Sequence, residues 1–197
     1  MGRTLVIANP KGGVGKTTTV ANLGVSLAAS GERVLLIDVD PQAALTASLG
    51  LDPYNLPTSI YDVLLGERVA LSRAVRPVEG APGVSLVPAS PELAAGEAQL
   101  ARLPDRALRL RQALDRAELP FDFILIDTPP SLGLLTLNAL VAAQELLIPV
   151  QTHYPAMRGV RLLMETVWRV KQDLNPDLRL IGVLPTMVEP GSRHARE

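Results

Sequence analysis

The amino-acid sequence predicts an α/β fold with a doubly wound, mostly parallel sheet that carries helices on both faces. Two observations predict this fold class: short, almost uninterrupted apolar runs recur along the chain, and longer segments with helical spacing of apolar residues lie between them. The chain has 197 residues, of which 47% are hydrophobic but only 3% aromatic. It is therefore long enough for one domain, 1–197, with a largely aliphatic core.

Six apolar runs are expected to form the strands of the sheet. In chain order they are 4–8, 33–38, 84–89, 121–127, 145–150 and 178–185. Stretches that contain Pro and Gly at 50–58 and 77–83 are expected to be surface loops within the domain. No internal repeat or low-complexity tract breaks the alternation, which fits a single domain.

Three segments between these runs have the spacing of amphipathic helices. The first, 16–30, places Val20, Leu23 and Leu27 on one face and is expected to stop at Gly31. The second runs from about Pro104 to Glu118. Its expected apolar face consists of Ala107, Leu110, Leu114 and Ala117. The third, 156–173, is expected to turn inward Val160, Leu163, Met164, Val167 and Trp168.

Composition excludes several classes of function. The chain contains no Cys, which rules out disulfides, thiolate metal sites and iron–sulfur clusters. No apolar run approaches the ~20 residues needed to cross a bilayer, so we expect a cytosolic protein with no membrane partner. The net charge of −1 predicts no bulk attraction to a polyanion.

A glycine-rich turn, NPKGGVGKTTT at 9–19, follows the first expected strand and leads into the first expected helix. This is the context of a phosphate-binding loop, in which backbone N–H groups surround an anion at a helix N-terminus. Lys16 is expected to reach the β- and γ-phosphates, Thr17 to bind Mg²⁺ and Thr18 to contact the α-phosphate. The alternative is a glycine-rich turn without a ligand. The residues expected to bind nucleotide are Lys11, Gly12, Gly13, Val14, Gly15, Lys16, Thr17 and Thr18.

The loop departs from the usual pattern at two neighbouring positions. The pattern G-x₄-GK[ST] requires glycine where this chain has Pro10, and an additional lysine, Lys11, follows directly. The chain has only three lysines among 19 basic residues: Lys11, Lys16 and Lys171. Surface solubility does not explain why two of the three lie in one loop.

Aspartates mark the ends of two expected strands. Asp38 and Asp40 lie at the end of the run 33–38, and Asp127 ends the run 121–127. Ligands of open α/β sheets bind at the carboxyl ends of the strands, so these side chains are expected to face the phosphate loop. Asp127 fits an acid that holds Mg²⁺ through water, and Asp40 is a second candidate for such a contact. Taken alone, each aspartate also fits an ordinary strand-end or turn residue.

The pairing of Pro10 with Lys11 resembles the deviant Walker A motif of the ParA/MinD family of ATPases. DVDPQ (38–42) resembles the switch I segment of that family, and DTPPSLGLLTLNAL (127–140) is similar to the switch II segment of its chromosomal ParA/Soj branch. Segments 58–67 and 87–100 also resemble that branch, so the likeness covers nearly the whole chain.

This resemblance implies a P-loop ATPase fold and specific roles for three catalytic residues. Lys16 neutralises phosphate charge in its own subunit, whereas Lys11 reaches the nucleotide of a partner subunit across an ATP-sandwich homodimer. Asp40 positions the attacking water, while Thr17 and Asp127 hold Mg²⁺. ATP hydrolysis to ADP and phosphate is expected to be slow and stimulated by a partner.

The resemblance also implies partners and a biological role. The ATP-bound dimer is expected to bind DNA without sequence preference and to act with a ParB-like centromere-binding protein in chromosome or plasmid partitioning. Its location would then be cytoplasmic and nucleoid-associated. Two alternatives remain open: a MinD-like membrane-positioning ATPase and a ParA-like protein that positions another cargo. Metabolic synthetases on the same scaffold would need substrate-binding residues that the sequence does not reveal.

The last part of the sequence departs from the family pattern. LPTMVEPGSRHARE (184–197) resembles the segment where the family begins its adenine pocket, so Met187 and Pro190 are expected near the adenine. The resemblance implies a further helix–strand–helix portion that we expect this domain to lack. Residues 43–47 and 151–159 also differ from the family pattern.

DNA binding by the family implies an Arg-rich surface. The candidates in this chain are Arg158, Arg161, Arg193 and Arg196, with Arg169 nearby. The alternative for the helical group is an exposed amphipathic face on which Glu165 pairs with neighbouring cations. A second stripe, formed by Arg106, Arg109 and Arg116, is expected to be solvated surface.

Overall fold

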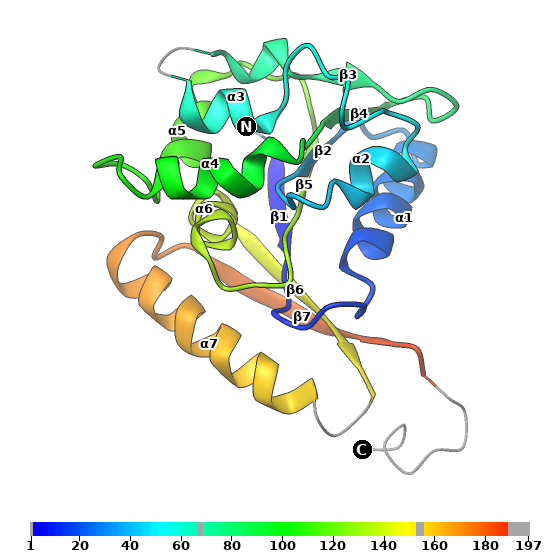
Figure 1. Ribbon diagram of the computed structural model, residues 1–197. Coiled ribbons are helices and arrows are strands. Elements are labelled where there is room, and N and C mark those ends of the chain that lie inside the picture. The colour runs from blue at the N-terminus through cyan, green and yellow to red at the C-terminus, as the bar shows by residue number, and fades with distance from the viewer. Residues whose placement is uncertain (1, 67–68, 153–155, 189–197) are drawn as a thin grey trace.

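The computed structural model of the chain describes residues 2–66, 69–152 and 156–188, and for 156–158 it describes the backbone alone. Figure 1 shows a central sheet between layers of helices. The strands are β1 (Arg3–Ile7), β2 (Val34–Asp38), β3 (Arg76–Pro77), β4 (Val84–Val87), β5 (Phe123–Asp127), β6 (Glu145–Gln151) and β7 (Arg179–Thr186). The helices are α1 (Lys16–Ala29), α2 (Ala44–Ser48), α3 (Ile60–Leu65), η1 (Leu71–Arg73), α4 (Glu92–Leu100), α5 (Arg109–Arg116), α6 (Leu134–Ala142) and α7 (Ala156–Asp173).

The sheet confirms the predicted fold class. Its seven strands have the order β3-β4-β2-β5-β1-β6-β7. All neighbouring strands run parallel except β3, which pairs with β4 in the antiparallel direction at the edge. Strand β3 ends at Pro77, the first residue of the predicted loop 77–83, and its two residues are too few to give a sequence pattern.

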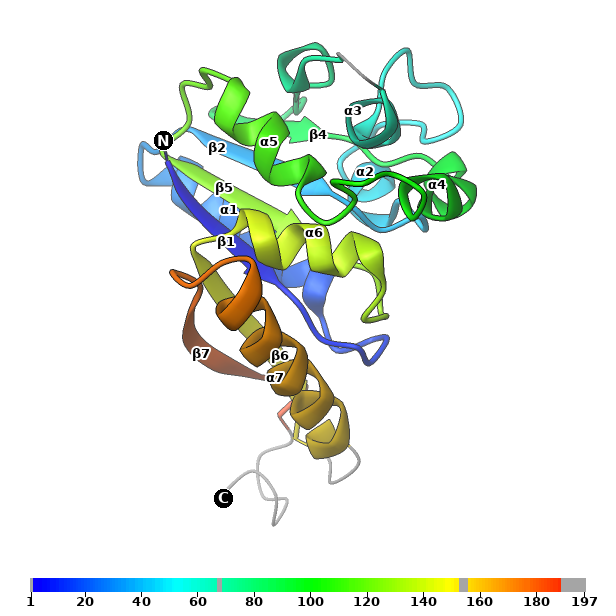
Figure 2. The same cartoon turned by 90° about the vertical axis from the view of Figure 1, so that its left-hand side faces the viewer.

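Each face of the sheet has its own core, as parallel strands covered on both sides require. Leu5 and Ile7 of β1 pack with α1 and α2 on one face, whereas Val6 of the same strand packs toward the other. That second face is covered by α3, α4, α5, α6 and α7 (Figure 2). None of the helices within the described ranges has the length and apolar character needed to cross a membrane.

Helix α1 confirms the first predicted helix, and Gly31 adopts a φ of +94° just beyond its end. Helix α5 begins at Arg109, later than the predicted start near Pro104, because residues 101–108 form turns. Helices α2, α3, α4 and α6 were not among the predicted ones. Helix α6 has buried residues on most of its surface, so it has no polar face to give an amphipathic period.

The predicted inner face of α7 is partly wrong. Leu163, Val167 and Val170 form the buried stripe, whereas Met164 is 36% and Trp168 64% exposed. Residues 163, 167 and 170 follow the i, i+4, i+7 spacing of one helix face, and Met164 and Trp168 are each rotated one position away from it. Helix α7 contacts α6 and β6 through this narrow stripe, and Figure 2 shows its outer side facing away from the sheet.

Candidate functional site

The carboxyl ends of three central strands bring the predicted site residues together. In the register of the sheet Ile7 of β1 lies beside Asp127 of β5, and Asp127 lies beside Asp38 of β2. The glycine-rich loop follows β1 directly, so it starts next to both aspartates. The structure therefore places the two aspartates and the start of the loop side by side at this edge of the sheet.

The loop backbone is shaped as a phosphate cradle requires. Gly13 and Gly15 have φ values of +70° and +88°, which side chains with a Cβ rarely adopt. Gly15 stands at the N-cap position of α1, where no described side chain caps the helix. The first N–H groups of α1 are thus free to bind an anion, and the helix dipole favours it.

The two loop lysines point to different places. Lys16 is only 6% exposed, and its Nζ donates a hydrogen bond to the Lys11 carbonyl at 3.2 Å. Burial lowers the pKa of Lys16 from 10.5, while the nearby Asp127 and Asp40 carboxylates act in the opposite direction. The Lys11 ammonium instead donates to Gln151 Oε1 at 2.8 Å, at the end of β6.

Two residues that sequence reasoning missed hold this loop. Gln151 also donates from Nε2 to the Gly13 carbonyl at 2.9 Å. Asn9 donates to the Pro149 carbonyl at 2.6 Å and accepts from the Lys11 N–H at 2.9 Å. Because Gln151 ends a strand at the same edge as Asp127, the strand-end rule used for the aspartates would also have pointed to it.

Thr17 and Asp127 form the pair expected of a magnesium site. The Thr17 hydroxyl donates to Asp127 Oδ2 at 2.7 Å, and Asp127 Oδ1 is buried with no hydrogen-bond partner in the described part of the chain. Burial raises the pKa of Asp127 to about 7, and the neighbouring Asp38 carboxylate adds to the rise. A buried carboxylate oxygen beside a hydroxyl fits Mg²⁺, which prefers oxygen ligands and keeps several waters.

The described residues contain no group of three or more acidic or His side chains that could enclose a metal by themselves.

Asp38 and Asp40 differ in what they contact. Asp38 is fully buried and accepts hydrogen bonds from the Thr46 hydroxyl at 2.8 Å, the Thr46 N–H at 3.0 Å and the Asp40 N–H at 3.0 Å. Burial raises the pKa of Asp38 to about 6. Within the described residues the Asp40 carboxylate accepts one hydrogen bond, from the Gln42 N–H at 2.9 Å, and it lies near Lys16. Asp38 therefore ties α2 to the sheet, and Asp40 is the freer carboxylate in the crevice.

The remaining predicted nucleotide contacts lie at the rim or outside the described residues. Thr18 is exposed on the first turn of α1. The Thr186 hydroxyl donates to the Val14 carbonyl at 2.9 Å, which brings the end of β7 against the loop. Next to it Met187 is 60% exposed, and its sulfur lies 2.9 Å from Gln151 Nε2. Pro190 lies outside the described residues.

The predicted DNA-binding arginines are described only in part. Arg193 and Arg196 lie outside the described residues, and Arg158 has no described side chain. Arg161 is exposed and pairs with Glu165 at 3.2 Å across one helical turn, as the amphipathic-face alternative expects. Exposed pairs of this kind contribute little to stability.

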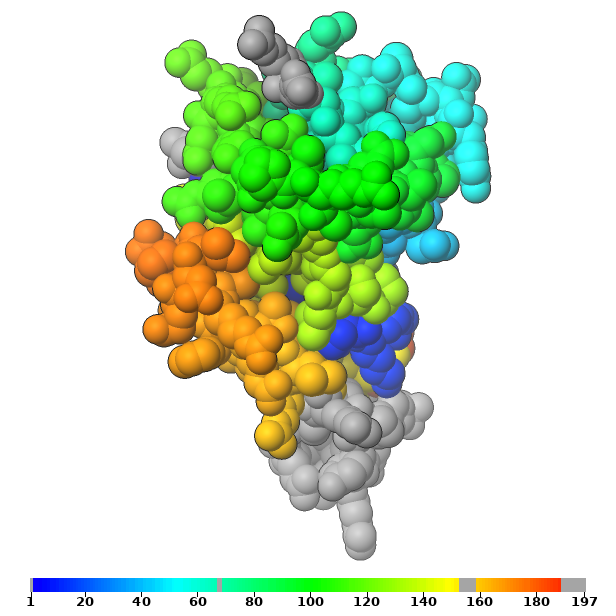
Figure 3. Space-filling model, turned by 60° about the vertical axis from the view of Figure 1, so that its left-hand side comes forward, coloured from blue at the N-terminus to red at the C-terminus, as the bar shows by residue number. Residues whose placement is uncertain are grey.

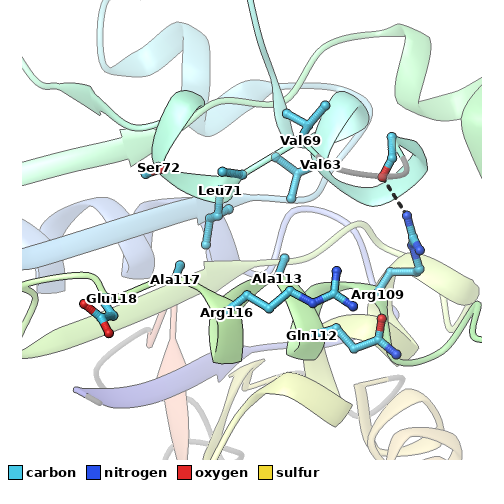
Figure 4. Close-up of a pocket in the computed structure, with 12 residues that line it drawn as sticks. Val63, Val69, Leu71, Ser72, Arg109, Gln112, Ala113, Arg116, Ala117 and Glu118 are labelled. Carbon is cyan, nitrogen blue, oxygen red and sulfur yellow. Dashed lines mark hydrogen bonds between the residues drawn. The ribbon is translucent and has the colours of Figure 1, made fainter.

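The predicted solvated stripe on α5 is wrong at Arg109. Its guanidinium donates to the carbonyls of Leu64 and Gly66, both at 2.8 Å, and holds α5 against the end of α3. Figure 4 shows this side chain at one end of a cavity of about 350 Å³ between α3, η1 and α5. The residues that line this cavity include none of the predicted nucleotide contacts.

Comparison with known proteins places the chain among nucleotide-binding relatives. Residues 2–180 match a family model described as an AAA domain. The chain is 47% identical over 189 residues to the chromosome partitioning protein ParA of Caulobacter vibrioides, an alignment that covers 95% of this chain and 70% of the relative. It is 42% identical over 189 residues to the sporulation initiation inhibitor protein Soj of Bacillus subtilis, with 96% of this chain and 74% of Soj covered.

Among solved structures, the chain resembles cobyrinic acid a,c-diamide synthase of Mycobacterium smegmatis with bound ADP and magnesium. The TM-score is 0.93 at 46% identity, and the match covers 100% of this chain and 79% of the synthase chain.

Proposed function

Because the chain belongs to the ParA/Soj family of chromosome-partitioning ATPases, we propose that it is a Mg²⁺-dependent ATP hydrolase that acts as a dimerising switch. ATP would join two copies in a sandwich dimer, the dimer would bind DNA without sequence preference, and a ParB-like partner would stimulate hydrolysis and return the protein to monomers. A slow intrinsic rate suits this role because the ATP-bound state must persist.

The contact between Thr17 and Asp127, beside the buried Lys16, is the observation that carries the proposal. Lys16 is buried beside the loop, where its ammonium can leave the Lys11 carbonyl for the more negative phosphate oxygens. Thr17 and Asp127 would hold Mg²⁺, which neutralises developing phosphate charge when it is bound. Asp40, with a single hydrogen bond in the crevice, would orient the attacking water.

Lys11 supplies the argument for a dimer. Its ammonium is held by Gln151 at the rim of the loop and not within the cradle that Lys16 occupies. A second cation placed outside the cradle can reach a phosphate brought close by another copy of the chain. Such a cation stabilises transition-state charge in the way an arginine finger does.

DNA binding by the dimer would depend on Arg side chains and hence on salt. Each phosphate contact releases counterions, so the affinity should fall steeply as the salt concentration rises. The candidates remain Arg158, Arg161, Arg193 and Arg196. A cytoplasmic, nucleoid-associated location would follow from such binding.

Light scattering combined with DNA binding, each with ATP and with ADP at two salt concentrations, tests the proposal. We expect dimers and DNA binding with ATP only, and weaker DNA binding at the higher salt concentration. A protein that stays monomeric with ATP and ignores DNA at low salt would contradict the switch model. Liposome pelleting in the same buffers distinguishes the MinD-like alternative, in which ATP would drive the protein onto vesicles.

The likeness to the diamide synthase raises a second candidate function, ATP-dependent amide formation on cobyrinic acid. It is supported by 46% identity over the whole chain. The two candidates differ in what ATP consumption requires: DNA and a partner protein for the partitioning switch, cobyrinic acid together with an ammonia donor for the synthase. ATP turnover measured with each addition separately decides between them.

A further inference from the structure

A carboxylate on helix α4 forms a hydrogen bond with the start of helix α6. Glu97 Oε1 accepts a hydrogen bond from the Leu134 N–H at 2.6 Å, between residues 37 positions apart. Leu134 is the first residue of α6, and Gly133 at its N-cap position has no side chain to cap the helix. Glu97 therefore supplies from another helix the acceptor, and the negative charge, that a helix N-terminus favours.

Glu97 closely approaches the residue before α6. A Cβ at Gly133 would displace the Glu97 carboxylate. The φ of −76° at Gly133 is open to other residues, so a larger side chain there would act on the Glu97 contact and not on the backbone.

Helix α4 provides a firm support for this carboxylate. Leu93 and Leu100 are buried in the core, at 1% and 0% exposure. Gly96, next to Glu97, lies so near Tyr61 of α3 that a Cβ would come within 2.8 Å of the ring. Because α4 is packed on both sides, it holds the Glu97 carboxylate in a fixed place and does not shift when α6 moves.

The segment that Glu97 holds, 128–133, leads from Asp127 to α6 and passes beside the phosphate loop. At its start, the Thr128 hydroxyl donates to the Ile7 carbonyl at 2.9 Å. Pro129 and Pro130 follow, and their rings fix φ. Pro130 Cβ lies 3.8 Å from the place that a Cβ on Gly12 would occupy. Figure 3 shows the green α4, the yellow-green start of α6 and the blue loop following one another along one face.

We propose that Glu97 is a positioning residue for ATP hydrolysis, a role that rests on the function proposed above. By holding Leu134, it fixes the far end of the segment 128–133. Because the two prolines restrict the backbone of this segment, fixing its far end also restricts where Pro130 lies against Gly12, next to Lys11. It likewise restricts Asp127 at the near end. Without the Glu97 contact, the magnesium-binding carboxylate and the loop lose a shared support on the α4 side.

Three variants test this role: Glu97→Ala, Glu97→Gln and the control Gln99→Ala. Glu97→Gln keeps a carbonyl oxygen as acceptor, and Gln99 is an exposed residue of the same helix. In Glu97→Ala we expect the Leu134 amide to exchange with solvent about fivefold faster, the size of a lost N-cap. The NMR signals of the Gly12 and Thr128 amides should also shift. Glu97→Gln should restore most of both effects, and Gln99→Ala should match the wild type.

Steady-state hydrolysis gives the second readout. Glu97→Ala should lower kcat about three- to tenfold with little change in KM for ATP, because Lys16 and the N-terminus of α1 do not depend on the Glu97 contact. Unchanged Gly12 and Thr128 signals in Glu97→Ala would overturn the positioning role, as would an unchanged kcat. A wild-type protein that hydrolyses no ATP would contradict the proposed function instead, and the amide signals would still decide whether Glu97 positions the segment.

Discussion

Replacing Asp127 with Asn should remove much of the pH dependence of the protein's stability when Mg²⁺ and ATP are withheld. The pKa of this carboxyl is raised from 3.8 to about 7, first by burial and then by the nearby Asp38 and Asp40 carboxylates, whereas the Thr17 hydroxyl and Lys16 oppose the rise. Ionising Asp127 in the folded protein therefore costs free energy that ionising it in the unfolded chain does not.

The sign and size of the effect follow from proton linkage. A carboxyl whose pKa is higher in the folded state binds its proton more tightly there, so stability is greatest below the unfolded pKa of 3.8 and falls as the pH rises toward about 7. Between about pH 5 and about pH 8, this shift corresponds to a loss on the order of 2 kcal/mol in the free energy of unfolding. Asp38, whose pKa burial raises to about 6, acts with the same sign.

Urea unfolding in EDTA at about pH 5 and about pH 8 measures this loss. The wild type should become less stable at the higher pH, and Asp127→Asn should lose distinctly less. Asp177→Asn removes an exposed carboxylate and serves as the control, which should follow the wild type. Equal losses in the wild type and Asp127→Asn would refute the reasoning from the buried charge.

Further substitutions test the lysine pair, the crevice and the packing. Lys11→Ala should bind ATP but form no ATP-dependent dimers and hydrolyse little, by light scattering and phosphate release; loss of ATP binding would make Lys11 a local phosphate contact. Asp40→Ala should bind ATP and hydrolyse it at least ~10-fold more slowly, and a wild-type rate would disprove its role. Gly24→Ala should cost about 1–3 kcal/mol in urea unfolding, because its Cβ would lie 2.7 Å from Leu36 Cδ2; an unchanged midpoint would show that α1 can shift. Trp168, at 64% exposure, should emit as a solvated indole that iodide quenches, and a blue-shifted, unquenched spectrum would contradict the observed face of α7.

The positions of the phosphate loop and the strand-end aspartates could be predicted because they depend on local sequence. Gly13, Gly15 and Lys16 follow a strand directly, and a strand's carboxyl end fixes where the next few residues lie. Asp127 could be predicted in the same way, since four apolar residues before it identify a buried strand. In each case the pattern determines the position without knowledge of the other elements.

Contacts between distant segments could not be predicted in this way. The bond from Lys11 to Gln151 spans 140 positions and exists because β6 lies beside β1 in the sheet. The bond from Glu97 to Leu134 depends on two helices, α4 and α6, that have no clear amphipathic signal. Helix α7 does have an amphipathic signal, but the spacing of its apolar residues could not show how many of them the neighbouring elements bury.

Lys11 binds Gln151 in its own chain, so its proposed role at the nucleotide of another copy requires a phosphate oxygen to compete with Gln151 for the ammonium. To serve another copy, the ammonium must leave Gln151 Oε1, a neutral acceptor 2.8 Å away. A hydrogen bond to a charged group contributes about 1.5–3 kcal/mol, and a phosphate oxygen forms a stronger, charge-assisted one. The exchange is therefore favourable only where a second cradle brings its nucleotide within reach of Lys11. Because Gln151 also holds the Gly13 carbonyl, the residue that Lys11 leaves remains attached to the loop and can bind the ammonium again after hydrolysis.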